Sequence, residues 1–199
     1  SNEERFMNWR SIDGINIESL DVPQYEVMLR GMLEKNRILD IIENFILFHK
    51  SKKKDYDLQG NQIGEHEVII KILAGYHQYF AVKKATEKTK IASSEEGDRK
   101  IGVIWHTQGS GKSFSMLFYA AQIVKELNNP TLVILTDRND LDEQLFGTFT
   151  NSIGILRESP KQANVRKLTE EQKKANIKAK DNSKEVNGLF DLLNERESG

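Results

Sequence analysis

The chain has 199 residues, of which 38% are hydrophobic and 30% charged, and this composition is typical of a water-soluble protein with a core for one domain of ordinary size. Cysteine is absent, which excludes a disulfide framework and cysteine-ligated zinc and suits the reducing cytoplasm. The formal net charge of −1 gives no overall attraction to nucleic acid, and no apolar run approaches the roughly 20 residues that cross a membrane. The sequence starts at Ser1 with neither an initiator methionine nor a signal peptide, so we expect a fragment of a longer cytoplasmic protein.

The first third of the chain predicts helices followed by a polar loop. Residues 27–48 place apolar side chains at helical spacing, which fits two helices or one broken helix with a single buried face; these side chains are Leu33, Ile38, Leu39, Ile42, Phe45 and Ile46. Residues 49–67 are polar and contain two glycines, so we predict a loop there and a domain boundary near residue 60. The three lysines from Lys52 to Lys54 can contact phosphate or lie in solvent, and we favour solvent.

Residues 76–160 alternate between helical and extended patterns. The predicted elements, in chain order, are a helix over 76–90 with Tyr79, Val82 and Ala85 inward, a loop over 91–100, an apolar strand over 101–105, a helix over 112–128 ended by Asn128, Asn129 and Pro130, a buried strand over 131–137, and a helix capped by Asn139 or Asp140. This order is the βαβ unit of a parallel sheet, so we predict an α/β fold. Beyond Pro160 the chain is lysine-rich over 161–184 and ends with an amphipathic helix over 186–196.

A glycine-rich turn, HTQGSGKS at residues 106–113, interrupts the core between the strand over 101–105 and the next helix. Its glycines allow tight or left-handed backbone, and the start of a helix offers unpaired N–H groups and a positive dipole end that bind anions. In such a turn a lysine side chain reaches the β and γ phosphates of a bound nucleotide, and a serine hydroxyl serves as a ligand for Mg²⁺. These are the features of a P-loop, so we predict a site for a nucleoside triphosphate with Mg²⁺. The candidate residues are Thr107, Gln108, Gly109, Ser110, Gly111, Lys112, Ser113 and Phe114, with Lys112 catalytic and Ser113 on the metal.

Several features of this turn have plainer interpretations. The first glycine position of the P-loop pattern holds His106, which is either a catalytic group or, as we favour, a histidine that packs and anchors the loop. The turn itself can be a glycine-rich connection with an incidental lysine, although G-x-G-K-S between a strand and a helix argues against this. Even a true P-loop does not distinguish a kinase or other phosphotransferase, a helicase-like motor and a non-catalytic nucleotide-binding module. The other histidines show no metal-ligand spacing.

Three ordered motifs resemble one family closely. They are YHQYFAV at 76–82, WHTQGSGKS at 105–113 and LVILTDRNDLDEQL at 132–145, and they are similar to the restriction (motor) subunit of Type I restriction-modification enzymes, within the superfamily 2 helicase-like translocases. The resemblance implies that residues 61–199 are the first part of a RecA-like P-loop NTPase domain, and that residues 1–60 are a helical connector or the trailing edge of a nuclease domain. It also implies ATP-driven translocation of double-stranded DNA, DNA cleavage, and modification and specificity subunits as partners.

The same resemblance assigns roles to single residues. Gln78 takes the position of the glutamine that reads the adenine edge, which would favour ATP over GTP. Arg138 lies in a motif that contacts the DNA backbone in related motors, although an ion pair with Asp137 or Asp140 explains it equally well. The basic stretch over 161–184 can lie along DNA or in solvent. The acidic Mg²⁺-binding box and the arginine finger of such motors are not found in this sequence, so we expect the chain alone not to turn over ATP at a useful rate.

Overall fold

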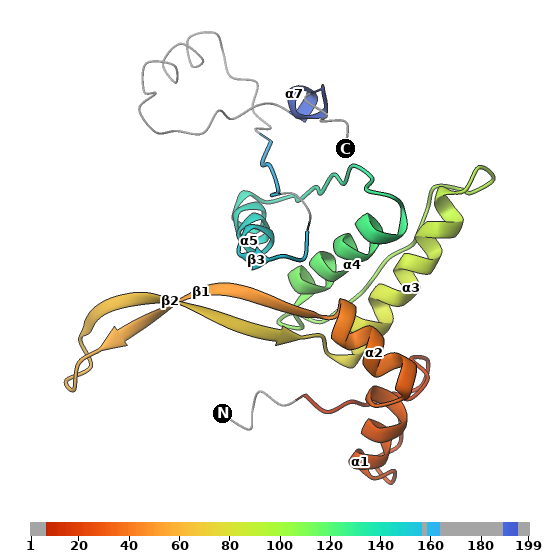
Figure 1. Ribbon diagram of the computed structural model, residues 1–199, viewed down its shortest axis with the longest axis horizontal. Coiled ribbons are helices and arrows are strands. Elements are labelled where there is room, and N and C mark those ends of the chain that lie inside the picture. The colour runs from red at the N-terminus through yellow and green to blue at the C-terminus, as the bar shows by residue number, and fades with distance from the viewer. Residues whose placement is uncertain (1–6, 157–158, 164–188, 195–199) are drawn as a thin grey trace. The chain divides into compact units, whose positions relative to one another are not determined.

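The computed structural model describes residues 7–156, 159–163 and 189–194 (Figure 1). Contacts within the chain divide it into two units, Ser1–Arg157 and Glu158–Gly199. The described part of the second unit contains the helix α7 (Leu189–Asn194), which confirms a helix within the predicted range 186–196. Most of the basic stretch, residues 164–184, lies outside the described residues, so its two interpretations stay open.

The N-terminal helical region is broken, as the sequence predicts. It consists of α1 (Gln24–Val27), the π-helical turn η2 (Met28–Met32) and α2 (Lys35–Asn44). The break is fixed by Glu34, whose carboxylate accepts hydrogen bonds from the N–H groups of Asn36 (3.2 Å) and Arg37 (2.9 Å). These bonds satisfy donors that a helix start leaves unpaired, and they lower the pKa of Glu34. Helix α2 ends at Asn44. The predicted extension of the helical pattern to residue 48 is wrong, because a strand begins at Ile46.

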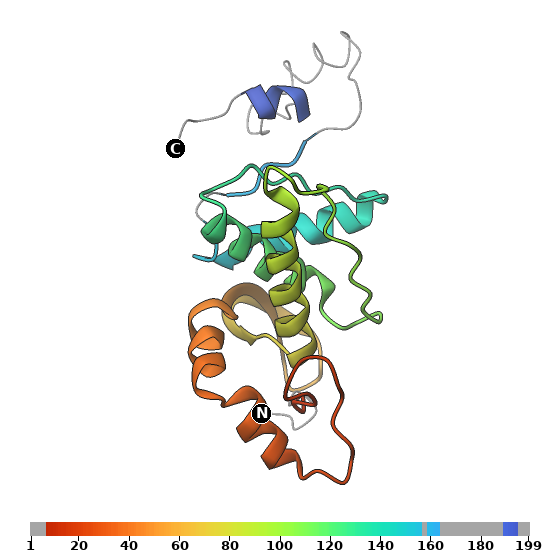
Figure 2. The ribbon, with the colours of Figure 1, turned by 90° about the vertical axis from the view of Figure 1, so that its right-hand side faces the viewer.

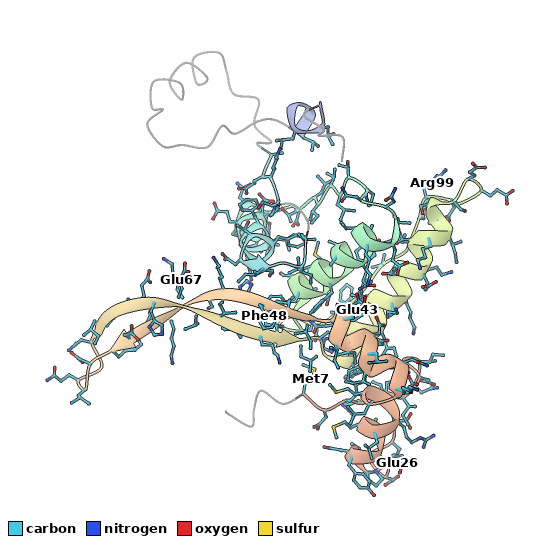
Figure 3. All side chains as sticks on the ribbon, in the orientation of Figure 1. Met7, Glu26, Glu43, Phe48, Glu67 and Arg99 are labelled. Atoms are coloured by element: carbon cyan, nitrogen blue, oxygen red, sulfur yellow. The ribbon has the colours of Figure 1, made fainter. Side chains whose placement is uncertain are left out.

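The polar segment over 49–67 is not a loop, so this prediction is wrong. Strands β1 (Ile46–Tyr56) and β2 (Gln62–Leu73) pair antiparallel along their length and form a long twisted hairpin that extends away from the helices (Figure 1). Figure 3 labels Phe48 near its base and Glu67 on its outer part. The polar composition misled the prediction, because a two-stranded ribbon exposed on both faces needs no apolar alternation. Strand β3 (Ser152–Ile153) pairs with β1, giving the order β2-β1-β3.

Three longer helices follow at the predicted places. They are α3 (Tyr76–Ser93), α4 (Lys112–Glu126) and α5 (Asn139–Thr150). Helices α3 and α4 lie side by side, and Figure 2 shows them from a second direction. The fully buried side chains Phe45, Val82, Leu117 and Phe118 join them to the end of α2. Glu43 of α2, labelled in Figure 3, also pairs with Lys125 of α4. Tyr79, Val82 and Ala85 are buried as predicted.

The predicted parallel sheet is not present among the described residues. Neither 101–105 nor 131–137 is assigned to a strand, and the strands that are described pair only antiparallel. Both segments are exposed, with Val103 at 91%, Trp105 at 89% and Leu135 at 84%. Apolar character predicts burial, whereas a strand also needs a neighbouring strand to pair with, and neither segment belongs to a described strand pair. None of the helices that the structure describes has the length and apolar character that a membrane-spanning helix requires.

Candidate functional site

The glycine-rich turn leads directly into helix α4. Gly109 (φ +79°) and Gly111 (φ +77°) both have left-handed backbone, and Gly111 is the N-cap residue that directly precedes α4. Other residues adopt this region at a cost, so both glycines are needed for the turn. At Gly111 space matters as well, because an added Cβ would lie 2.7 Å from Nε2 of Gln78. The left-handed backbone that the sequence allows at these two glycines is therefore present.

Lys112 is held by the turn itself. Its ammonium group donates to the carbonyl oxygens of Thr107 (2.9 Å) and His106 (3.3 Å). The Thr107 carbonyl also accepts from the N–H (3.3 Å) and the hydroxyl (2.7 Å) of Ser110, which closes the turn. Both acceptors of Lys112 are uncharged, and its side chain is exposed. The lysine can therefore exchange these carbonyls for an anionic ligand that enters the turn.

The first turn of α4 supplies further donors for an anion. The N–H groups of Lys112, Ser113 and Phe114 belong to the first turn, where a helix has no internal acceptors for them. The helix has 15 residues, so its dipole adds partial positive charge at the same end. Thr107, Gln108 and Gly109 are exposed, and Ser113 is half-buried. Together these groups place several N–H donors and the positive end of the helix dipole at the start of α4, an arrangement that suits an anion.

Helix α3 supports the turn through two side chains of its own first turn. Nε2 of Gln78 donates to the carbonyls of Gly111 (3.0 Å) and Ser110 (3.4 Å), and Oε1 accepts from the N–H of Gly75 (2.8 Å). Nε2 of His77 lies 3.1 Å from the Ser110 carbonyl. Gln78 is buried, and each end of its amide bonds to the protein. Its predicted contact with adenine stays a prediction.

His106 is a packed residue, which is the interpretation that the sequence favours. Its ring meets that of His77 edge to face at a centroid distance of 5.0 Å, and its Nδ1 is buried without a hydrogen-bond partner. Burial lowers the pKa of His106, and His77 and Lys112 lower it further, so the ring is neutral at pH 7. A neutral ring leaves Lys112 as the positive charge of the turn.

A cavity of about 370 Å³ lies beside the turn, between α3, residues 11–17 and residues 101–106. Aromatic and basic side chains line it, among them Tyr76, Phe80, Lys84 and Trp105. His77 and His106 also face this cavity, whereas Gln78 does not. The glutamine therefore lies against the glycine-rich turn and not in the neighbouring cavity.

Arg138 lies at the start of α5, away from the contacts of the turn described above. Its guanidinium forms two hydrogen bonds to the carboxylate of Asp140, at 2.6 and 3.1 Å, in a pair that is exposed on both sides. Of the two sequence-based interpretations, the ion pair is present, and DNA contact stays a prediction. Arg138 is also the residue that precedes α5, without a side-chain cap, so the predicted caps Asn139 and Asp140 are wrong.

The donor set suits Mg²⁺ only in part. The hydroxyl of Ser113 at the start of α4 is an oxygen donor of the kind that Mg²⁺ prefers. Within residues 7–156, 159–163 and 189–194, no group of three or more His, Asp or Glu side chains is placed to hold a metal ion. Ser113 would therefore hold Mg²⁺ together with the phosphates and water.

Comparison with known proteins decides the family. Residues 77–186 match the family model described as SWI2/SNF2 ATPase, a range that begins at His77 and includes the whole turn. The chain belongs to the SWI2/SNF2 ATPase family. It is 42% identical over 168 residues to the Type I restriction enzyme HindI endonuclease subunit of Haemophilus influenzae, which covers 82% of this chain and 15% of that protein. It is 32% identical over 195 residues to the putative type I restriction enzyme MjaIXP endonuclease subunit of Methanocaldococcus jannaschii, covering 87% and 17%.

These relatives confirm the resemblance inferred from the three sequence motifs. This SWI2/SNF2 ATPase chain thus spans only 15% and 17% of the length of the two relatives. No solved structure matches it. Sequence reasoning assigned residues 107–114 and Gln78 but missed His77, because its partner Ser110 is 33 positions away in the sequence. Its place next to Gln78 on the same helical turn was the available signal.

Proposed function

We propose that the chain binds ATP at Gly109–Ser113 and forms part of the DNA-translocating and DNA-cleaving subunit of a Type I restriction enzyme. The observation that carries the proposal is the left-handed pair Gly109 and Gly111 at the start of α4, with Lys112 bound to carbonyls alone. The family match to an ATPase over 77–186 and the names of the relatives support it. In this proposal the partners are double-stranded DNA and the modification and specificity subunits, in the cytoplasm.

Each group of the turn has a separate task in the proposed reaction. The N–H groups of residues 109–113 surround the β-phosphate, since anions bind where several backbone donors converge. Lys112 leaves the carbonyls of His106 and Thr107 and bonds the β and γ phosphate oxygens, where it stabilises charge that develops on transfer. Mg²⁺, when bound, would neutralise phosphate oxygens, and Ser113 would hold it in place. Neutral His106 adds no charge that competes with Lys112 for the anion.

The experiment that tests the proposal is calorimetric titration of the protein with ATP and Mg²⁺, beside GTP and the variant Lys112→Ala. We expect the unsubstituted protein to bind ATP. The variant should bind it at least about tenfold more weakly, because one charge-assisted contact to phosphate is removed. In the full-length subunit the same variant should abolish ATP-dependent translocation and cleavage. Full activity of that variant would exclude a role of Gly109–Ser113 in driving the motor.

A further inference from the structure

Two consecutive carbonyl groups of the turn face helix α3. The Ser110 carbonyl lies 3.1 Å from Nε2 of His77, and the Gly111 carbonyl accepts from Gln78 (3.0 Å) and from the N–H of Ser115 (3.0 Å). In a planar trans peptide the C=O and the following N–H point in opposite directions. The N–H groups of Gly111 and Lys112 are therefore turned away from α3, toward the open side of the turn. A contact that fixes these two carbonyls therefore also fixes the direction of two N–H groups that can donate to a phosphate.

The two carbonyls differ in how much they depend on side chains. The Gly111 carbonyl keeps the Ser115 N–H, a helical hydrogen bond, whatever Gln78 does. The Ser110 carbonyl has His77 at 3.1 Å and the longer contact to Gln78 at 3.4 Å. A carbonyl oxygen only accepts, so Nε2 of His77 must carry the proton. His77 is therefore the closest side-chain donor that fixes the Ser110–Gly111 peptide.

The ring of His77 is itself held in place. It packs edge to face against Tyr76 at 5.5 Å and against His106 at 5.0 Å, and it sits in the first turn of α3. Such contacts restrict the ring, so the hydrogen bond to Ser110 costs little side-chain entropy on formation. A rigid donor is what aiming a peptide group requires.

We propose that His77 is a positioning residue for the phosphate-binding turn, acting through its Nε2–H on the Ser110 carbonyl. The inference rests on the proposed binding of ATP and adds a residue on another helix to that site. His77 does not contact the nucleotide in this proposal. Its effect is on the direction of the Gly111 N–H, and hence on the affinity of the turn for a phosphate group.

The test compares two substitutions that separate the donor from the ring. His77→Gln keeps an N–H donor near the position of Nε2, whereas His77→Phe keeps a flat ring against Tyr76 and His106 but has no donor. Both are made in the full-length subunit, with ATP affinity, KM and kcat of DNA-stimulated ATPase, and the melting temperature as measurements. We expect His77→Phe to raise the Kd and KM for ATP about three- to tenfold with kcat within about twofold, and His77→Gln to restore most of the affinity.

Controls separate this inference from the proposed function. His66 lies in the hairpin and pairs with Asp55 at 2.9 Å on an exposed surface, so His66→Phe should leave ATP affinity unchanged. Absence of ATP binding in the unsubstituted protein would remove the proposed function itself. Binding that Lys112→Ala abolishes but His77→Phe leaves unchanged would overturn the role of His77 alone. Equal losses in His77→Phe and His77→Gln would also overturn it, because the donor would then be irrelevant.

Discussion

The side-chain amide of Gln78 can support the turn or bind the nucleotide base, but it cannot do both at once. In the structure its Nε2 donates to the carbonyls of Gly111 and Ser110, and both carbonyls have another donor, Ser115 N–H and His77 respectively. The amide can therefore leave without an unpaired carbonyl behind it, and turn to a base that needs a donor and an acceptor together.

From this we predict that Gln78→Ala weakens the binding of ATP more than the binding of GTP. The adenine edge loses a matched pair of hydrogen bonds, worth about tenfold in affinity, whereas GTP loses only the support of the turn. Calorimetric titration of both nucleotides against the variant measures the ratio. An equal loss for ATP and GTP would show that Gln78 only supports the turn.

Tyr79 connects α3 to α2 through a carboxylate. Its hydroxyl donates to Asp40 at 2.9 Å, and Asp40 also accepts from Lys83 at 3.0 Å and from Asn44 at 2.8 Å. Burial raises the pKa of Tyr79, and Asp40 raises it further. Burial also opposes the charge of Asp40, but the hydrogen bonds outweigh it and lower the pKa of that carboxyl.

A Tyr79→Phe change should therefore destabilise the protein in a pH-dependent way. A raised folded-state pKa contributes stability that is complete below the unfolded value near 10, and this contribution is lost as the pH rises above it. We expect a loss of about 1–2 kcal/mol at pH 8 that shrinks between pH 9.5 and 11. Urea unfolding of both proteins at these pH values tests this, with the exposed Tyr25→Phe as the control. A difference that is constant with pH would contradict the role of the hydroxyl.

The end of helix α4 depends on a left-handed asparagine. Asn128 has φ +55°, and the N–H of Asn129 donates to the Val124 carbonyl at 3.0 Å, which is the pattern of a Schellman motif. Asparagine tolerates this backbone better than other side-chain-bearing residues, and β-branched residues tolerate it least. We predict that Asn128→Val lowers the free energy of unfolding by about 1–2 kcal/mol, whereas Asn128→Gly leaves it equal or slightly higher. Urea unfolding of the two variants gives the comparison, and a stable valine variant would refute it.

The elements that could be predicted from the sequence are those determined by neighbours along the chain. Helix α4 begins at Lys112, directly after Gly111, and ends at Glu126, before Asn128, because turn and cap residues act locally, and both ends lie within two residues of the prediction. The hairpin could not be recognised by apolar alternation, although Asp57 and Gly60 (φ +85°) mark its turn. Segments 101–105 and 131–137 show the opposite error, since an apolar run carries no information about a pairing partner. The contact between His77 and Ser110 is likewise non-local and could not be predicted.

At the scale of the whole molecule, the described residues contain donors for a phosphate but few groups that complete catalysis. Lys112, Ser113 and the start of α4 are present, whereas among the described residues Lys112 bonds to carbonyl oxygens and no acidic metal cluster is found. The two relatives are about six to seven times longer than the parts that match. The isolated chain should therefore bind ATP but hydrolyse it slowly.

We predict that the isolated chain binds ATP with Mg²⁺ but releases phosphate at least 10³-fold more slowly than the full-length subunit on DNA. In phosphoryl transfer a supplied arginine alone contributes about 10³ to 10⁵ in rate, and an orienting base for the attacking water adds to that. Calorimetric titration tests the binding of ATP, and phosphate release at saturating ATP, measured on the same preparation, tests the slow turnover. Binding without turnover would place the remaining catalytic groups outside these 199 residues. Turnover that approaches the full-length rate and is lost in Lys112→Ala would instead mean that the chain holds a complete site, with a base supplied by one of its own carboxylates.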